Sequence, residues 1–420
     1  MDAHFTLAEL ATLFSPSELA EIRAYYGPIY ANAALSPFIE LGLSLLILRF
    51  TIRPLWAVAG AAAQRTSARL AWMRTAPVAR ALVGAIEKLW GGPGYGQALW
   101  FAGLQFWLGW LVAMPRSFYF GWIHEARFGL THQSAWEWAW RVFKGGAVAA
   151  LAMALLAFGL FALARRTRRW WLLLGLGSAL ALTISGAFDP YRGRLYFDQE
   201  PLPQGPLRER LTEVLAKAEV PYRELWVRKT SVASKRVQAY FAGQGPTRSI
   251  VFNDVLLDQF STEEVVAVIA HEAAHIHEPK WPGRLAAAVM VLLLLLGADR
   301  VLRLSARRGW FGTTDFGDLR NLPLLLFLYW LVVLPFGPAS NAISRSRELA
   351  ADAYAVELTG DPDTFRSMLI RAARINKEDP TPPAWVVILG YSHPTLAQRL
   401  GALPTAPTPT PVPSLAVEPE

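Results

Sequence analysis

Two histidines and a glutamate have the spacing of a helical metal site in the pentapeptide His271-Glu272-Ala273-Ala274-His275. Residues four positions apart lie on one face of an α-helix, so both imidazoles can bind one zinc ion. Glu272 would then lie beside the open position of the metal, where a carboxylate can take a proton from water. The pattern predicts a zinc hydrolase site. The alternative is a pair of surface histidines on a helix.

The residues before this pentapeptide favour a helix. Ser261 and Glu264 have the spacing of a capping box, in which each side chain accepts a hydrogen bond from the backbone of the other residue. An apolar run follows, which contains Val265, Val266 and Ile269. The pentapeptide is therefore expected on a helix that begins near Ser261.

A third protein ligand is needed, because a catalytic zinc ion normally has three together with a water molecule. The candidate is Glu348, which is followed one helical turn later by Asp352. One carboxylate can bind the metal while the other supports a ligating histidine. Two predicted membrane spans separate Glu348 from His275. Such a hairpin returns the chain to the side it left, so the two halves of the site are expected to meet on one membrane face.

Composition predicts a membrane protein. The chain is 53% hydrophobic, has a mean hydropathy of +0.26 and contains 17 Trp, which exceeds the usual apolar content of soluble domains. The absence of Cys excludes disulfides, thiolate ligands, a cysteine nucleophile and a prenylated C-terminus. The net charge is +8, and the arginines cluster beside apolar segments. Anionic lipid headgroups explain this charge better than nucleic acid, which is not expected as a partner.

Six segments have close to the roughly 20 apolar residues that a bilayer crossing requires. They are residues 34–52, 97–114, 145–164, 170–188, 285–302 and 322–338. A seventh segment, Ala71 to Trp90, contains four charged residues and by hydropathy alone is amphipathic or interfacial. No basic stretch precedes an apolar one at the N-terminus, so the first span is expected to stay in the mature chain.

We expect three regions. Residues 1–188 form an N-terminal membrane domain, residues 189–403 form a metallopeptidase domain that includes the spans at 285–302 and 322–338, and residues 404–420 form a disordered tail rich in Pro and Thr. The second region mixes helices and strands. Gly205 to Ala218 reads as an amphipathic helix, and Arg223 to Arg228 and Ser249 to Leu256 read as strands. An exposed edge of the last strand could bind substrate backbone; a plain core strand is the alternative.

Several segments besides the pentapeptide resemble the Ste24-type CAAX prenyl proteases, which are integral-membrane zinc peptidases of family M48. The resemblance extends over most of the chain. It is carried by Tyr119 with Glu125 and Gly129, Leu202-Pro203-Gln204-Gly205, Ala239-Tyr240-Phe241 with Gly243, Ile250-Val251 with Leu256-Leu257, the run from Ser344 to Ala355, and Ser392-His393-Pro394 with Arg399.

The resemblance implies a ligand set and a mechanism. One zinc ion would be held by His271, His275 and Glu348, and Glu272 would be the general base. His393 and Arg399 would line the site and help to stabilise the oxyanion.

The resemblance also implies substrate contacts near Gln238, Ala239 and Tyr240, although Gln238 stands where the family usually has Asn. The implied fold is mainly α, a multi-pass membrane protein in which seven transmembrane helices surround a water-filled chamber. A zincin-like α+β peptidase domain with a small β-sheet completes it. The seventh helix would be Ala71 to Trp90, whose charges would face the chamber.

Clusters of Arg and Lys occur on both sides of the predicted membrane spans, so the positive-inside rule does not decide which side of the membrane the HExxH motif, His271 to His275, faces. In a seven-span arrangement two clusters fall on the side of the HExxH motif and two on the other side. The first two are Arg53, Arg65 and Arg69, and Arg116, Arg127, Arg141 and Lys144; the others are Arg165, Arg166, Arg168 and Arg169, and Arg303, Arg307 and Arg308. The resemblance implies an active site that faces the cytoplasm.

We therefore expect a zinc endopeptidase that acts on membrane-associated or prenylated polypeptides. One alternative is a quality-control protease with no lipid requirement. Another is a non-catalytic scaffold or channel, which would have no need for a complete ligand set. The sequence does not predict the oligomeric state.

Overall fold

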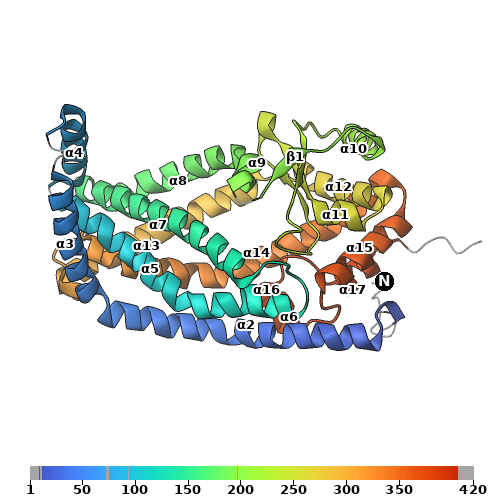
Figure 1. Ribbon diagram of the computed structural model, residues 1–420, viewed down its shortest axis with the longest axis horizontal. Helices are drawn as coiled ribbons and strands as arrows, with labels where there is room; N and C mark the ends of the chain where they lie inside the picture. Colours follow the sequence, from blue (N-terminus) through green and yellow to red (C-terminus); the bar gives the residue numbers. More distant parts are fainter. Residues whose placement is uncertain (1–8, 10–11, 72–74, 93, 196, 405–420) are drawn as a thin grey trace, which may run out of the picture.

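The molecule is an elongated helical bundle with a small mixed α and β region at one end (Figure 1). The computed structural model describes residues 9, 12–71, 75–92, 94–195 and 197–404. We call the end with the β-sheet the sheet end and the opposite end the far end. Six long helices connect them: α2 (Pro16–Phe50), α5 (Tyr95–Phe118), α7 (Ala135–Arg166), α8 (Trp170–Ala187), α13 (Trp281–Arg308) and α14 (Leu322–Thr359).

Five helical stretches in the described residues are long and apolar enough to cross a membrane. They are Pro16–Phe50, Tyr95–Arg127, Ala135–Arg166, Trp281–Arg308 and Leu319–Thr359. α8 is shorter, but it leads from the end of α7 at the far end back to the sheet end. The chain is thus an integral, multi-pass membrane protein with mainly helical structure.

The predicted span from Ala71 to Trp90 is not confirmed. Its described helix, α4 (Pro77–Trp90), has 14 residues and lies at the far end, above α3 (Ile52–Arg69) in the view of Figure 1. Gln97 Nε2 at the start of α5 donates to the Trp56 carbonyl at 2.9 Å. α5 therefore begins at the end of the molecule where α2 finishes, and the chain between them makes no net crossing.

This arrangement corrects the predicted position of one basic cluster. Arg53, Arg65 and Arg69 belong to α3, so they lie at the far end and not on the side of the HExxH helix. The predicted position had assumed that residues 71–90 cross the membrane. The arginines that follow α7 and end α13 also lie at the far end, so most of the clustered positive charge is there.

The sheet has four strands in the order β1-β2-β4-β3. β2 and β4 are parallel, and both outer strands are antiparallel to their neighbours. The strands are β1 (Gln199–Pro201), β2 (Leu225–Arg228), β3 (Ala239–Ala242) and β4 (Ser249–Asn253). All five residues of β4 are buried, as expected for an apolar run that is covered on both faces. The predicted exposed edge on this strand is therefore wrong, and β3 forms that edge instead.

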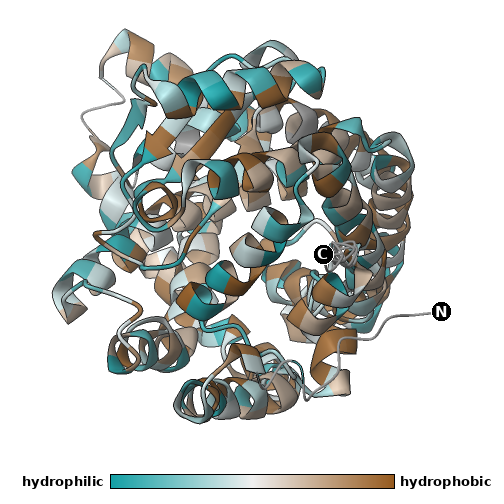
Figure 2. Ribbon diagram, turned by 90° about the vertical axis from the view of Figure 1, so that its right-hand side faces the viewer, coloured by the Kyte–Doolittle hydropathy of each residue, from teal (hydrophilic) through white to brown (hydrophobic). Residues whose placement is uncertain are grey.

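Short helices complete the sheet end. They are η2 (Tyr119–Ile123), α6 (His124–Arg127), α9 (Asp189–Arg192), α10 (Pro206–Lys217), α11 (Asp254–Gln259), α12 (Thr262–His277), α15 (Pro362–Asn376), α16 (Ala384–Gly390) and α17 (Leu396–Ala402), with single turns η3 (Gly193–Leu195) and η4 (Gly245–Thr247). Two further turns, η5 (Trp310–Gly312) and η6 (Leu319–Asn321), join α13 to α14 at the far end. Figure 2 looks at the sheet end and shows hydrophilic and hydrophobic residues alternating along its helices. α10 confirms the predicted amphipathic helix.

One hydrophobic core joins α10, α12, α15 and the inner strands, with Ile250, Phe252 and Ile269 fully buried in it. Phe14 and Ile22 from the N-terminal region belong to the same core. The N-terminal stretch thus packs against the region predicted as a separate domain, and the boundary at residue 188 stays a prediction. Residues 405–420 of the predicted tail lie outside the described residues.

Candidate functional site

α12 is held in position by its cap and by its apolar face. The Ser261 N–H donates to Glu264 Oε2 at 2.9 Å, and the Glu264 N–H donates to Ser261 Oγ at 3.3 Å, which confirms the predicted capping box. Val265, Val266 and Ile269 are buried in the core. Because this face is fixed in the core, the opposite face presents the two histidines of the motif to α14.

The histidines of α12 meet Glu348 of α14. His271 Nε2 lies 3.3 Å from Glu348 Oε2, and His275 Nε2 lies 3.4 Å from Glu348 Oε1. The three residues each offer a ligand atom, and these atoms lie within 4.8 Å of one another. Ligands at about 2.0 to 2.1 Å from a tetrahedral zinc ion are separated by about 3.3 to 3.4 Å. The donor set therefore has the identity and spacing of a zinc site.

The second nitrogen of each imidazole faces a carboxylate. His271 Nδ1 lies 2.9 Å from Asp352 Oδ1, and His275 Nδ1 lies 2.7 Å from Glu278 Oε1. A carboxylate at this position keeps the proton on Nδ1 and leaves the lone pair of Nε2 free to bind a metal. Both rings are thus oriented with Nε2 toward Glu348.

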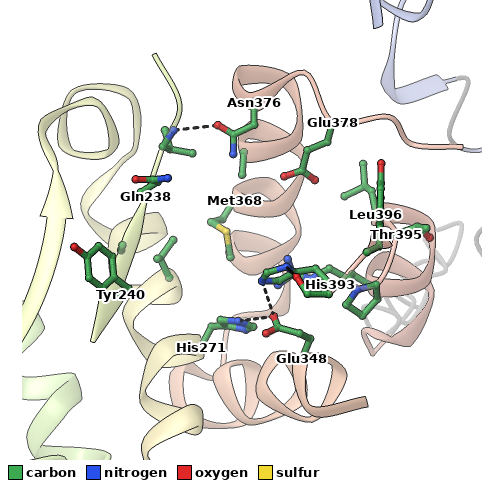
Figure 3. A pocket seen from close by; sticks show the side chains of 18 of the residues that line it. Gln238, Tyr240, His271, Glu348, Met368, Asn376, Glu378, His393, Thr395 and Leu396 are labelled. Atoms are coloured by element: carbon green, nitrogen blue, oxygen red, sulfur yellow. Dashed lines mark hydrogen bonds and ion pairs between the residues drawn. The ribbon is translucent and has the colours of Figure 1, made fainter. Parts of the chain in front are cut away.

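One carboxylate oxygen of Glu348 accepts no hydrogen bond from the described residues. Its Oε2 atom is fully buried and has no hydrogen-bond partner among the described residues. A buried carboxylate oxygen without a partner carries a large desolvation cost, which a bound cation removes. Figure 3 shows the Glu348 side chain between His271 and His393, with dashed lines that mark the ion pairs. This orphaned oxygen is the second observation that fits a metal ion.

Arg399 lies behind the ligands. Its Nε donates to Asp352 Oδ2 at 2.8 Å and its Nη2 donates to Asp352 Oδ1 at 2.6 Å. This bidentate pair fixes the carboxylate that faces His271. The resemblance implied that Arg399 helps to stabilise the oxyanion, but its Nε and Nη2 donors are both bonded to Asp352. This geometry favours a role for Arg399 in positioning Asp352 and, through it, His271.

A cavity of about 810 Å³ opens beside the ligand group and is lined by Glu272, Glu348, His393 and Arg399, among others. Burial raises the pKa of the Glu272 carboxyl, while the neighbouring His271 and His275 act in the opposite direction. A raised pKa suits a group that must accept and then release a proton. The His393 side chain is 63% exposed, and its Nε2 lies 3.6 Å from Glu348 Oε2.

The predicted substrate-binding residues line the same cavity from the strand side. Gln238, Ala239 and Tyr240 are all part of its wall, and Figure 3 shows Gln238 and Tyr240 across the space from His393. The Gln238 N–H donates to Asn253 Oδ1 at 3.0 Å, and its carbonyl accepts from the Asn253 N–H at 3.0 Å. These bonds fix the start of the edge strand β3 beside the candidate ligand group.

Several residues of the site were not predicted. Glu278 is the carboxylate that faces His275 Nδ1. Its position three residues after His275, the spacing of residues on the same face of a helix, could have predicted this contact. Asn376 accepts the Val237 N–H at 3.0 Å and so holds the segment before β3. Arg345 donates to the carbonyls of Val387 and Tyr391, which secures the loop that carries His393. No local pattern in the sequence points to these last contacts.

Comparison with known proteins gives two family matches. Residues 201–406 match the model of peptidase family M48, and residues 8–188 match that of the CAAX prenyl protease N-terminal region with five membrane helices. Among curated proteins, the chain is 28% identical over 313 residues to CAAX prenyl protease 1 homolog of Oryza sativa, covering 73% of this chain and 72% of that protein. It is 27% identical over 337 residues to CAAX prenyl protease 1 of Saccharomyces cerevisiae, with the same two coverages, 73% and 72%.

The fold also matches a solved structure. The crystal structure of S. mikatae Ste24p superposes with a TM-score of 0.77 at 22% sequence identity, and the match covers 94% of this chain and 90% of that one. At this identity the likeness establishes the fold alone. It includes both the long helices and the sheet end.

Proposed function

Because this chain belongs to peptidase family M48 and is a membrane zinc metalloprotease, we propose that it hydrolyses peptide bonds of membrane-associated or prenylated, CAAX-type polypeptides. The observation that carries the proposal is the group of His271, His275 and Glu348, whose ligand atoms lie within 4.8 Å of one another. The names of the relatives support the CAAX class of substrate. A quality-control role without a lipid requirement remains the second candidate.

The proposed site holds one zinc ion on these three side chains. A zinc ion there would polarise the scissile carbonyl and lower the pKa of the attacking water. Glu272 accepts the proton of that water and passes it to the leaving amine. His393, exposed at the cavity wall, donates to the oxygen of the tetrahedral intermediate. Asp352 and Glu278 hold the ligating imidazoles, and Arg399 holds Asp352.

The edge strand β3 gives the substrate a place to bind. One side of Ala239 and Tyr240 pairs with β4, and both residues line the cavity. A substrate in extended conformation can add to the free side of β3 by backbone hydrogen bonds. Peptides N-methylated at the residues that pair with β3 should therefore bind more weakly, while methylation one residue away should have little effect.

The membrane arrangement is also part of the proposal. We propose that the helices which cross the bilayer surround a chamber; the described helices account for six crossings, and the seventh, predicted for residues 71–90, is supported by the family match, which has five membrane helices in residues 8–188. The resemblance to CAAX prenyl proteases supports a cytoplasmic active site, whereas the arginines at the far end oppose it under the positive-inside rule.

The chain has no Cys, so single cysteines placed at Arg69 or Glu357 can be labelled with an impermeant thiol reagent in intact cells. Labelling at Arg69 but not at Glu357 is expected for a cytoplasmic active site, and the reverse pattern refutes it.

The catalytic role is tested by replacing Glu272 with Gln. This change removes the base but leaves the three ligands in place. We expect the variant to retain bound zinc and to lose about 10²- to 10⁴-fold in turnover. Full activity in that variant would refute the assignment. Matched prenylated and bare peptides, assayed with the wild-type protein, separate the lipid-dependent function from the quality-control one.

A further inference from the structure

The segment that leads into the edge strand β3 has no regular structure of its own. Residues 229–238, between β2 and β3, form no helix or strand. β3 itself pairs with a neighbouring strand on one side only. Without a backbone ladder, such a segment is fixed by the individual hydrogen bonds that it makes. The contacts of residues 229–238 therefore decide where β3 lies relative to the candidate ligand group.

Arg236 ties this segment to two membrane helices. Its Nη2 donates to the two carboxylate oxygens of Glu125 at 3.1 and 3.2 Å, and to the Tyr25 hydroxyl at 2.6 Å. The Tyr25 hydroxyl donates in turn to Glu125 Oε1 at 2.5 Å. Hydrogen bonds to charged groups are stronger than neutral ones, and the three side chains form a closed network. α2 and α6 are thus joined to the start of the peptidase sheet.

The same arginine lies against the residues that place β3. Arg236 Nη1 donates to the Asn376 carbonyl at the end of α15 at 3.2 Å, and the Arg236 carbonyl accepts from Asn253 Nδ2 at 2.6 Å. These two asparagine side chains also accept the N–H groups of Val237 and Gln238, both at 3.0 Å. A shift of the Arg236 guanidinium would therefore be passed directly to the first residues before β3.

The chain beyond Glu125 supplies a second attachment. Gly129 follows α6 with a φ of +69°, in the left-handed region that favours glycine. The turn is closed by the Leu130 N–H, which donates to the Glu125 carbonyl at 2.8 Å, and the Leu130 carbonyl accepts the Lys235 N–H at 3.0 Å. Glu125 and Gly129 belong to a segment that resembles the CAAX prenyl proteases but has no part in the ligand group. Both positions hold residues 229–238.

We propose that Tyr25, Glu125 and Arg236 are positioning residues, which fix the edge strand β3 from the N-terminal membrane region so that its free side is aligned with the ligand group. The inference rests on the proposed protease function, in which a substrate strand adds to β3. It gives the region matched at residues 8–188 a role in substrate alignment, although that region supplies none of the three candidate ligands.

The first pair of variants changes one carboxylate. Glu125→Gln removes the charge that pairs with Arg236 and keeps the size of the side chain. Glu224→Gln is the control, because Glu224 precedes β2 in the same sheet and pairs with Arg208 at 2.6 Å. The two ion pairs are similarly buried: Arg236 and Glu125 are 31% and 20% exposed, and Arg208 and Glu224 are 18% and 26% exposed.

The second pair changes one glycine and keeps the test valid if Glu125→Gln fails to fold. Gly129→Ala disturbs the turn that holds Lys235, and Gly309→Ala is its control. Both glycines end a helix, with φ of +69° and +65°, and an added side chain meets no atom within 4 Å at either. The strain is therefore nearly equal, but Gly309 follows α13 at the far end.

The first measurement needs no substrate, because amide hydrogen exchange at residues 236–242 reports how firmly β3 is held. We expect Glu125→Gln and Gly129→Ala to speed exchange there by about fivefold or more, the effect of losing one hydrogen bond. The two controls should change it by less than about twofold. Unchanged exchange in both test variants would overturn the proposal. Equal acceleration in all four variants would also overturn it, since that result means a general loss of stability.

The second measurement asks whether β3 still pairs with the substrate. A farnesylated peptide and its analogue N-methylated at the amide that pairs with β3 are compared by fluorescence anisotropy in the Glu272→Gln background, in which they are bound but not cut. Methylation should weaken binding by about fivefold. Adding Glu125→Gln should weaken the unmethylated peptide by the same factor, after which methylation should cost less than about twofold. In the active protein, Glu125→Gln should raise KM and leave kcat within about twofold.

A variant that is merely less stable would keep the full effect of methylation, and that result would overturn the inference. So would the absence of a methylation effect before Glu125 is changed, because β3 would then not pair with the substrate. The two hypotheses fail separately. If the wild-type protein cleaves no peptide but the exchange and binding patterns hold, the positioning of β3 stands and the protease function does not.

Discussion

Replacing Asp352 with Asn tests whether the carboxylate behind His271 prepares the metal site. Asp352 Oδ1 faces both His271 Nδ1 and Arg399 Nη2, while Oδ2 accepts from Arg399 Nε. In either orientation an Asn side chain turns its NH₂ group toward at least one of these donors. The variant keeps the size of the side chain but cannot satisfy all three contacts.

The expected loss can be estimated from similar contacts. Removing a carboxylate that supports a ligating histidine typically costs about 10- to 100-fold in metal affinity, or ~1.4 to ~2.7 kcal/mol. The Arg399 side chain is 18% exposed, so the loss of its counter-charge also destabilises the fold. Breaking a buried pair costs up to about 5 kcal/mol, and the remaining Asn contact reduces that figure. We expect the thermal midpoint of Asp352→Asn to fall, and that of Asp352→Ala to fall further.

The assay is zinc affinity by competition with a chromophoric chelator, with peptide hydrolysis measured at saturating zinc. Glu357→Gln is the control, because it removes one carboxylate from an exposed position on the same helix. A positioning role predicts that saturating zinc restores part of the activity of Asp352→Asn. Unchanged zinc affinity in this variant would refute the reasoning, since the contact to His271 would then have no bearing on the metal.

Three further outcomes are expected. Glu264 is buried, and its pKa lies below the ordinary value of 4.5; burial raises it, but the bonds from Ser261, Ser367 and Arg371 outweigh that effect. Its contribution to stability is thus present above pH 4.5 and lost as pH falls through the depressed pKa, so Glu264→Gln should lower the melting temperature by about 2 to 4 °C at pH 7 and the gap should close in acid. Removing zinc with a chelator should lower the melting temperature reversibly, because zinc at 100 times its Kd contributes about 2.7 kcal/mol; an unchanged melting curve would count against a bound metal. Glu278→Gln should weaken zinc binding by about tenfold, less than Asp352→Asn, since the Glu278 side chain is 22% exposed; a larger effect than that of Asp352→Asn would contradict this order.

The ligand group could be predicted because its geometry is mostly local. Helix periodicity alone places His271 and His275 on one face, and the same rule relates Glu348 to Asp352. The capping box at Ser261 marks the start of the helix. The hairpin of two membrane spans explains why residues more than 70 positions apart in the chain reach the same place.

The remaining features depend on long-range contacts. β3 is only four residues long and lies at the edge, whereas β4 is an apolar run that reads equally well as an interior or an edge strand. The count of seven crossings stays a prediction: the N-terminal family that the chain matches has five membrane helices, whereas the described helix α4 has only 14 residues. The engagement of Arg399 by Asp352 involves residues 47 positions apart, and no local pattern encodes it.

α14 is one continuous helix that contains both a bilayer-spanning segment and Glu348, with Pro335 and Pro338 between them. Prolines are the usual places where a helix bends. Ten positions beyond Pro338, a change of about 10° in the bend would displace Glu348 by about 2.6 Å, which is more than a coordination bond can stretch. A tilt of the bilayer-spanning segment in a thinner or thicker membrane would therefore move Glu348 relative to His271 and His275. Zinc affinity is thus expected to depend on the thickness of the surrounding bilayer.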